Sequence, residues 1–132
     1  MVDGHYPLRY QKFWVTLGGF LVVAIIVGSL YPLELPSEIS LSDKIQHAIA
    51  YGVLTSWFLL IFHGRRAWLK VVVCALLLGA LIELAQSFTD FRFAEWLDMA
   101  ANTFGVVFGS VVSVTPFRFM LAKFERLMAV CF

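Results

Sequence analysis

Nine side chains that can carry charge, move protons or form strong hydrogen bonds gather near the ends of apolar stretches in this chain. They are Asp43, Lys44, His47, Tyr51, Glu83, Gln86, Arg92, Asp98 and Asn102, and we refer to them as the polar cluster. A membrane protein rarely keeps such residues at membrane depth without a partner or a task. The polar cluster is therefore the candidate functional site, and its members are the predicted ligand-binding residues.

Three segments each contribute a stripe of polar residues, with the spacing of side chains stacked on one helical face. Asp43, His47 and Tyr51 fall at i, i+4 and i+8. The two further stripes are Glu83 with Gln86 at i and i+3, and Asp98 with Asn102, Gly105 and Gly109 at i, i+4, i+7 and i+11. These stripes predict three helices whose polar groups meet near one depth, with the glycines allowing close helix packing.

Two kinds of chemistry suit these residue types. A histidine beside a carboxylate is an acid–base pair for hydrolysis or group transfer, and the candidate catalytic residues are His47, Glu83 and Asp98. A histidine with two carboxylates is also a known ligand combination for a catalytic divalent metal, although we assign no metal ligand and leave cofactors open. The sequence has no nucleophile motif, zinc-ribbon spacing or glycine-rich phosphate loop. Whether the chain is an enzyme therefore stays open.

Each member of the polar cluster also has a purely structural interpretation. His47 can serve as a hydrogen-bond hub, and Glu83 can be held by a neighbouring cation or amide. Asp98 and Asn102 can cap their helix or form hydrogen bonds between helices. The two basic members can pair with nearby acids, or they can meet lipid phosphate.

The composition defines the class of protein in which these residues work. Of the 132 residues, 61% are hydrophobic and 14% are charged, whereas soluble domains carry about 25% charged residues. This balance predicts a polytopic membrane protein, with the lipid bilayer as its main partner. The formal net charge of +1 does not support a nucleic-acid partner. Cys74 and Cys131 show no pairing pattern and predict neither a disulfide nor a catalytic thiol.

Four apolar stretches predict an all-α fold, a bundle of four transmembrane helices. An apolar stretch of this length forms a helix of about 27 Å, close to the hydrocarbon thickness of a bilayer. The predicted spans cover about residues 13–30, 45–62, 71–88 and 97–114. Gly28 and Ser29 also suit a signal-peptide cleavage site, but we expect the first stretch to be retained as a membrane helix. Residues 1–116 are the expected transmembrane domain.

Lysine and arginine predict how the bundle is oriented. Eight of the ten basic residues lie before the first span, between the second and third spans, or after the fourth. The positive-inside rule places these segments, and with them both termini, in the cytoplasm. The polar cluster then faces the outer leaflet.

Residues 117–132 differ from the four spans, because their apolar positions alternate with basic residues at helical spacing. This segment is too short and too charged to cross a bilayer, so we expect an amphipathic helix lying on the cytoplasmic leaflet as an anchor. Its apolar positions are Phe117, Met120, Leu121, Phe124, Leu127 and Met128.

Several short motifs occur in a recognisable order between residues 43 and 109. They are Asp43-Lys44-Ile45-Gln46-His47-Ala48-Ile49-Ala50-Tyr51, Glu83-Leu84-Ala85-Gln86, Arg92, and Asp98 with Asn102 and Gly105. In type and order these motifs resemble the VanZ-like membrane protein family, named for a protein associated with teicoplanin resistance. The resemblance implies a small multi-pass protein of the bacterial cytoplasmic (inner) membrane, connected with the cell envelope and antibiotic resistance. It implies no particular reaction.

Three hypotheses of function follow from the polar cluster. In the first, it is an outer-leaflet cavity that binds an envelope lipid, a lipid-linked glycan precursor or an amphiphilic antibiotic such as a glycopeptide, with Lys44 and Arg92 meeting phosphate or carboxylate. In the second, His47 and Glu83 serve an intramembrane acid–base or metal-dependent hydrolase or transferase. In the third, the chain is a structural or accessory subunit of a membrane complex. A proton-coupled transporter fits less well, because four short helices leave little room for alternating access. Oligomers are permitted but not required.

Overall fold

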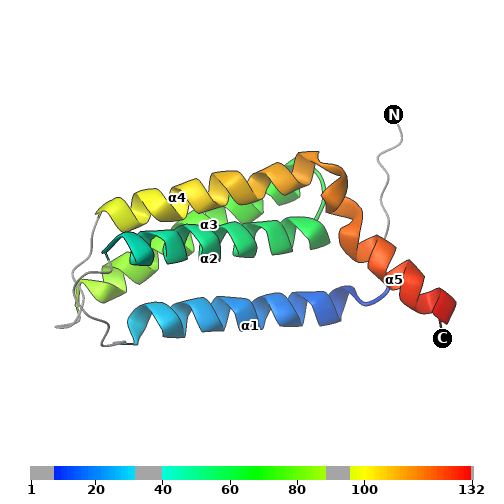
Figure 1. The fold of residues 1–132 in the computed structure, drawn as a ribbon, viewed down its shortest axis with the longest axis horizontal. Helices are drawn as coiled ribbons and strands as arrows, with labels where there is room; N and C mark the ends of the chain where they lie inside the picture. Colours follow the sequence, from blue (N-terminus) through cyan, green and yellow to red (C-terminus); the bar gives the residue numbers. More distant parts are fainter. Residues whose placement is uncertain (1–7, 32–39, 89–95, 132) are drawn as a thin grey trace.

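The computed structural model describes residues 8–31, 40–88 and 96–131, and in these ranges the chain is all-helical, without strands. The elements are α1 (Gln11–Leu30), α2 (Ser40–Ile61), α3 (Arg65–Gln86), α4 (Trp96–Ser110), the 3₁₀ turns η1 (Val111–Val114) and η2 (Pro116–Phe119), and α5 (Met120–Cys131). Figure 1 shows α2, α3 and α4 running alongside one another, α1 beside them, and α5 projecting from one end. The predicted all-α class is confirmed.

At their N-terminal ends, α1 to α4 begin before the predicted apolar stretches. The third helix begins at Arg65, about six residues before its predicted start, and the N–H of Trp68 already donates to the carbonyl of Gly64 at 2.9 Å. Hydropathy detects only the apolar part of a helix, whereas backbone hydrogen bonds continue into its polar ends. In the fourth predicted span, α4 ends at Ser110, and η1 completes the span before Pro116.

Among the residues that the structure describes, three segments are long and apolar enough to cross a membrane. They are α1, α3 and the combined segment Trp96–Val114 of α4 and η1. The 22-residue α2 is not in this group, because Asp43, Lys44 and His47 occupy its first turns and shorten its apolar part. A fourth span through α2 therefore stays a prediction.

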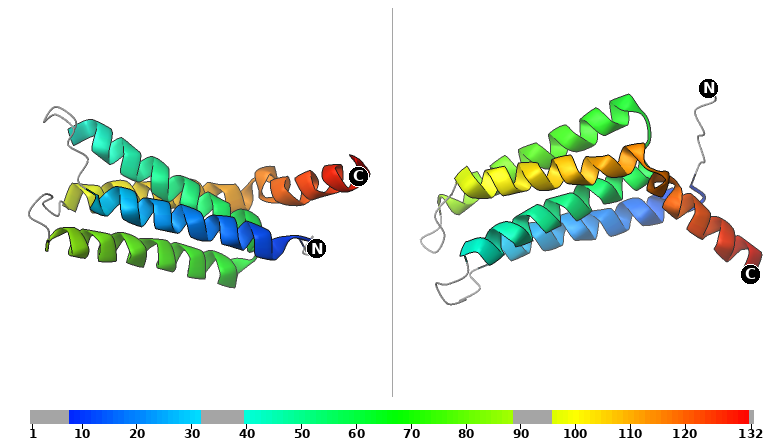
Figure 2. Two further views of the ribbon diagram at one scale, coloured as in Figure 1. Left: turned by 90° about the horizontal axis from the view of Figure 1, so that it is seen from below. Right: turned by 45° about the horizontal axis from the view of Figure 1, so that its top comes forward.

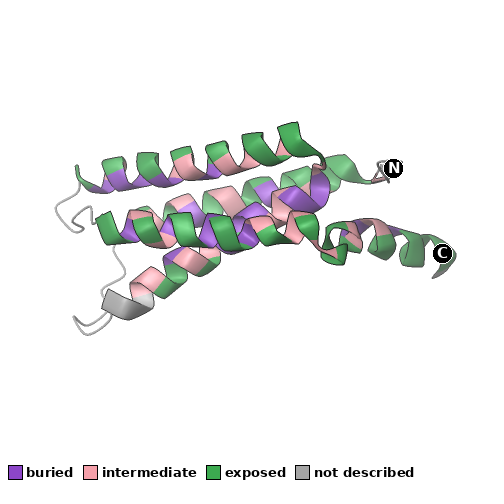
Figure 3. Ribbon diagram, turned by 90° about the horizontal axis from the view of Figure 1, so that it is seen from above, coloured by how far each residue is buried: buried purple, intermediate pink, exposed green. Residues whose placement is uncertain are grey.

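The outward faces of the helices are apolar. Figure 3 shows exposed positions on the outer sides of the helices and buried positions between them. Phe20, Leu81 and Phe104 are between 61% and 67% exposed. Apolar surface of this extent is uncommon on a soluble monomer, but it is the surface that lipid chains cover. The structure therefore supports a bilayer as the surroundings of the bundle.

The central helix of the bundle is α2, which packs against α1, α3 and α4. The left view of Figure 2 shows α1 running lengthwise along α2 and α3. The largest buried cluster takes residues from all four helices, and it includes Ile25, Tyr51, Leu54, Ile82 and Val106. Because α2 is surrounded by these helices, the polar stripe that it carries lies against its neighbours.

Glycines bring α2 and α4 into backbone contact. A β-carbon on Gly105 would collide with the carbonyl oxygen of Ala48 and would lie 3.0 Å from the nitrogen of Gly52. A β-carbon on Gly109 would collide with the carbonyl oxygen of Gly52 and would lie 3.0 Å from Cβ of Thr55. The Gly105 and Gly109 positions thus serve close packing within the chain, as small-xxx-small faces do.

The carboxylate of Glu125 joins α5 to the beginning of α1. Its Oε2 accepts the backbone N–H of Arg9 at 2.6 Å, and its Oε1 accepts the backbone N–H of Tyr10 at 3.0 Å and the indole N–H of Trp14 at 2.7 Å. Donors at a helix N-terminus have no partner within the helix and favour a negative charge. On the same helix, Leu121 packs against the end of α2. The position of α5 on a membrane leaflet stays a prediction.

Candidate functional site

The candidate site begins where α2 and α4 start side by side. Nζ of Lys44 donates to Oδ1 of Asp98 across this interface at 3.0 Å. The side chain of Lys44 is 22% exposed and that of Asp98 is 8% exposed. The ion pair therefore joins a partly exposed lysine to a buried carboxylate. Asp43 lies beside it and is 31% exposed. Both carboxylates occupy the first turn of a helix, where the helix dipole favours a negative charge. We call Asp43, Lys44 and Asp98 the rim.

One turn deeper, His47 connects the rim to α4. Its Nδ1 lies 3.0 Å from Oδ1 of Asn102. An amide oxygen can only accept, so Nδ1 carries the hydrogen and donates it. The other ring nitrogen, Nε2, lies 3.9 Å from Oδ2 of Asp43. His47 is only 6% exposed. The hydrogen bond from Nδ1 to Asn102 therefore fixes the orientation of the ring, with Nε2 on the side of Asp43.

The interior remains polar a further turn inward, around Gly79 of α3. A β-carbon on Gly79 would lie 3.2 Å from Nδ2 of Asn102 and 3.4 Å from Oη of Tyr51. Both side chains are 1% exposed, and neither atom has a hydrogen-bond partner among the described residues. Glu83 is 8% exposed and close enough to Tyr51 to interact electrostatically. These polar atoms have almost no accessible surface, so they form a polar layer inside the bundle.

The structure brings most, but not all, of the polar cluster together. The members that meet directly across the α2–α4 interface are Asp43, Lys44, His47, Asp98 and Asn102. Gln86 serves another contact, because its Nε2 donates to the carbonyl of Ser29 at 2.9 Å and so fastens α3 to the end of α1. Arg92 lies outside the described residues. The predicted site is therefore centred on two helices, with Tyr51 and Glu83 forming its inner end.

Three members of the cluster form an arrangement that can bind a cation. Asp43, His47 and Asp98 each offer one ligand atom, and these atoms lie within 4.8 Å of one another. The Nδ1 hydrogen bond to Asn102 leaves Nε2 to face the carboxylates, which is how proteins commonly orient a metal-binding histidine. When the ring is doubly protonated, the same geometry instead pairs an imidazolium with Asp43. The site can thus bind a divalent cation or exchange a proton.

An apolar groove between α2 and α4 adjoins the rim. Its volume is about 490 Å³, and its walls include Ala48, Gly52, Phe104 and Phe108. Lys44, Ala48 and Gly52 follow one another at i, i+4 and i+8, so the rim and the groove share one face of α2. An ionic rim above an apolar groove is complementary to an amphiphile.

The sequence interpretation missed the two phenylalanines of α4 that line this groove. The rings of Phe104 and Phe108 stack with their centroids 6.5 Å apart. Each phenylalanine directly precedes a packing glycine, Gly105 or Gly109. That repeated Phe-Gly pair was the available signal, because it places an aromatic ring beside each point of close helix contact.

Comparison with known families adds one finding to this geometry. A family model described as VanZ/LLP1 matches residues 9–120, which include every helix from α1 to η2. No curated protein and no solved structure matched the chain.

Proposed function

Since the chain belongs to the VanZ/LLP1 family, we propose that it is a multi-pass protein of the bacterial inner membrane whose polar cluster binds the headgroup of an amphiphile. The ligand class comprises envelope lipids, lipid-linked glycan precursors and amphiphilic antibiotics such as glycopeptides. Binding modifies the envelope or its sensitivity to the antibiotic. This is the type of function expected of a family associated with glycopeptide resistance.

The observation that carries the proposal is that Lys44 of the rim and two residues of the apolar groove, Ala48 and Gly52, share one face of α2. Lys44 is partly exposed and already oriented by Asp98, so it can meet a phosphate or carboxylate without a large loss of side-chain freedom. The groove along α2 and α4 has room for an apolar chain, since ligand pockets commonly measure about 300–1,000 Å³. Arg92, as a second cation for the headgroup, is part of the proposal.

The proposed membrane arrangement has four spans, with α2 as the second, within a domain of residues 1–116. The central position of α2 among three candidate spans supports this count. Both termini are placed in the cytoplasm, and residues 117–132 lie on the cytoplasmic leaflet. Phe124, Leu127 and Met128 of α5 are 44% to 67% exposed and supply an apolar face for that contact. The rim then faces the outer leaflet, where envelope precursors and antibiotics meet the membrane.

Substitution of Lys44 tests the proposed binding function. The probes are a polyprenyl diphosphate and teicoplanin, each titrated against purified protein in mild detergent and followed by native mass spectrometry. Lys44→Gln is expected to lower the affinity for the probe tenfold or more, because a charge-assisted hydrogen bond contributes about 1.5–3 kcal/mol. Unchanged retention of both probes would contradict the proposal.

Two further variants separate binding from folding. Lys44→Gln combined with Asp98→Asn replaces the ion pair by a neutral hydrogen-bonding pair, so that no carboxylate is left without its cation. Lys12→Gln removes an exposed lysine at the beginning of α1, far from the rim. The double variant should remain folded and lose the probe, and Lys12→Gln should retain it. If the double variant retains the probe as well as the wild type does, the rim is structural.

The cation-binding arrangement supports a second candidate function, a metal-dependent hydrolase or transferase. Its basis is that Asp43, His47 and Asp98 present their ligand atoms within 4.8 Å of one another. Mixed imidazole and carboxylate ligands suit Zn²⁺ or Mn²⁺. In this candidate, Lys44 competes with the metal for Asp98, because it already holds Oδ1 of that carboxylate.

Lys44 therefore distinguishes the two candidate functions. When the protein is titrated with Zn²⁺ and with Mn²⁺ and weighed by native mass spectrometry, a metal site predicts tighter binding in Lys44→Gln and at least tenfold weaker binding in His47→Ala. Headgroup binding alone predicts no stoichiometric metal in any of these proteins. Metal binding that survives in both His47→Ala and Asp98→Asn would rule out this set of ligands.

A further inference from the structure

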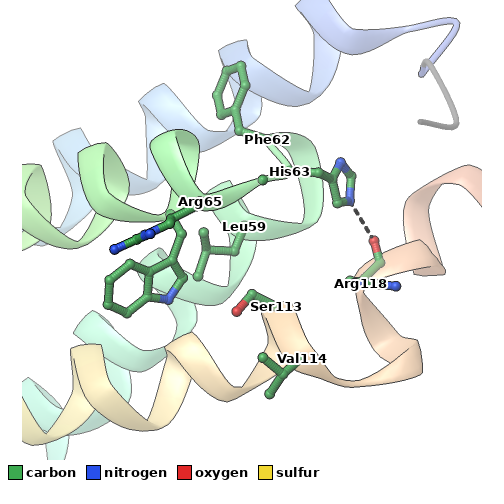
Figure 4. A pocket seen from close by; sticks show the side chains of 9 residues that line it. Leu59, Phe62, His63, Arg65, Ser113, Val114 and Arg118 are labelled. Atoms are coloured by element: carbon green, nitrogen blue, oxygen red, sulfur yellow. Dashed lines mark hydrogen bonds between the residues drawn. The ribbon is translucent and has the colours of Figure 1, made fainter. Parts of the chain in front are cut away.

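At the end of the bundle opposite the rim, basic residues surround two separate hollows. His63, at the end of α2, lies between them and lines both. Its Nε2 donates to the carbonyl oxygen of Arg118 at 3.0 Å. Figure 4 shows this contact and the smaller hollow, of about 310 Å³, which is lined by Arg65, Arg118 and Ser113. We call it the arginine hollow.

The larger hollow is a groove of about 720 Å³ with walls from α1, α2 and α3. Its inner walls are apolar, with Val22 from α1, Leu54 and Phe58 from α2, and Leu78 from α3. Its mouth is basic, because Arg66 and Lys70 line the groove in the first turns of α3. We call it the three-helix groove. It combines a long apolar wall with positive charge at one end.

From this combination we propose that the three-helix groove binds an anionic phospholipid from the leaflet at this end of the bundle. The phosphate meets Arg66 and Lys70, and an acyl chain lies along the apolar walls. Basic pockets between membrane helices are the usual sites for anionic headgroups. This site is independent of the polar cluster, which lies at the other end of α2, and it does not depend on the headgroup function proposed there.

The chemistry of the groove selects by charge. A phospholipid with a net negative headgroup keeps its attraction to both cations, whereas a zwitterionic headgroup brings its own positive charge to the same place. Phosphatidylglycerol and phosphatidylcholine with identical acyl chains are therefore the matched pair of probes. The first should bind and the second should bind much more weakly.

Paired charge removal at the same end of the bundle tests the proposal. Arg66→Gln with Lys70→Gln removes two charges from the three-helix groove, and Arg65→Gln with Arg118→Gln removes two charges from the arginine hollow only. In native mass spectrometry titrations with phosphatidylglycerol, the first double variant should bind about thirtyfold more weakly. The second should bind within about threefold of the wild type. Equal losses in both would show diffuse attraction to basic residues and would overturn the assignment.

A second measurement leaves the cations unchanged. Cys74 is exposed, lines the three-helix groove and lies deeper than Lys70. In a Cys131→Ser background it is the remaining thiol. Labelling of Cys74 by a membrane-permeant maleimide should slow severalfold when phosphatidylglycerol is added, and phosphatidylcholine or soluble glycerol 1-phosphate should not slow it. Labelling at the same rate with and without phosphatidylglycerol would show that no acyl chain occupies the groove.

Discussion

Replacing Gly105 by alanine is expected to lower the free energy of unfolding by about 1–3 kcal/mol, although alanine is normally the better helix former. The added β-carbon collides with the backbone carbonyl of Ala48, and a backbone atom cannot rotate away as a side chain can. The helices α2 and α4 must therefore separate. Because Asn102 lies on α4 one turn before Gly105, the same movement lengthens its hydrogen bond to His47. Probe binding at the rim should weaken together with stability.

Gly19 of α1 provides the matched control. Nothing lies within 4 Å of a β-carbon built there, so Gly19→Ala should leave stability unchanged or raise it by up to about 1 kcal/mol. Both variants are compared with the wild type by reversible unfolding in one detergent, with probe binding measured on the folded fraction. The expected result is a loss of stability for Gly105→Ala and no loss for Gly19→Ala. A Gly105→Ala variant as stable as Gly19→Ala would mean that α2 and α4 do not depend on this contact.

Replacing Glu125 by alanine is expected to be the second large perturbation, at about 2–3 kcal/mol. The carboxylate accepts three N–H donors and is 9% exposed, and hydrogen bonds to a charged group contribute about 1.5–3 kcal/mol each before water replaces part of the loss. Trp14 should also become more mobile, since its indole N–H donates to Glu125. The measurements are reversible unfolding and the polarity of the tryptophan emission.

Two substitutions separate the effect of the charge from that of the side chain. Glu125→Gln keeps one acceptor oxygen and should lose less stability than Glu125→Ala. Lys123→Gln changes an exposed charge on the same helix and should have almost no effect, since substitutions on an exposed surface usually remain within about 0.5 kcal/mol. If Lys123→Gln and Glu125→Ala have equal effects, the contact between α5 and α1 contributes nothing specific.

Much of the fold follows from the local sequence. The apolar stretches indicated the helices, and the glycine spacing after Asp98 indicated close packing against another helix, which the structure identifies as α2. The polar stripes on α2 and α4 were also informative, because residues four apart share a helical face. This is why the hydrogen bond between His47 and Asn102, and the ion pair between Lys44 and Asp98, lie within the predicted site.

What the sequence did not reveal depends on how helices are placed against one another. Gln86 follows Glu83 by three residues, a spacing that places both on one face of α3, yet it contacts Ser29 of α1. A spacing of three residues defines a face of α3, but it does not define which neighbour that face meets. Glu125 was missed for a related reason. A single acid in a basic amphipathic segment resembles a solvated side chain until the beginning of α1 is placed beside it.

The contact between Glu125 and the beginning of α1 has a consequence for biogenesis. Arg9 and Glu125 are separated by 116 positions in the sequence, so a ribosome synthesises nearly all of the bundle before the carboxylate exists. Until then, the first donors of α1 must find water or lipid headgroups. Membrane insertion of the first helix and completion of its N-terminus are therefore separate events, and the second follows translation of α5. A truncation between Val114 and Glu125 would leave every candidate membrane span in place, but the N-terminus of α1 would lack the carboxylate that accepts its donors.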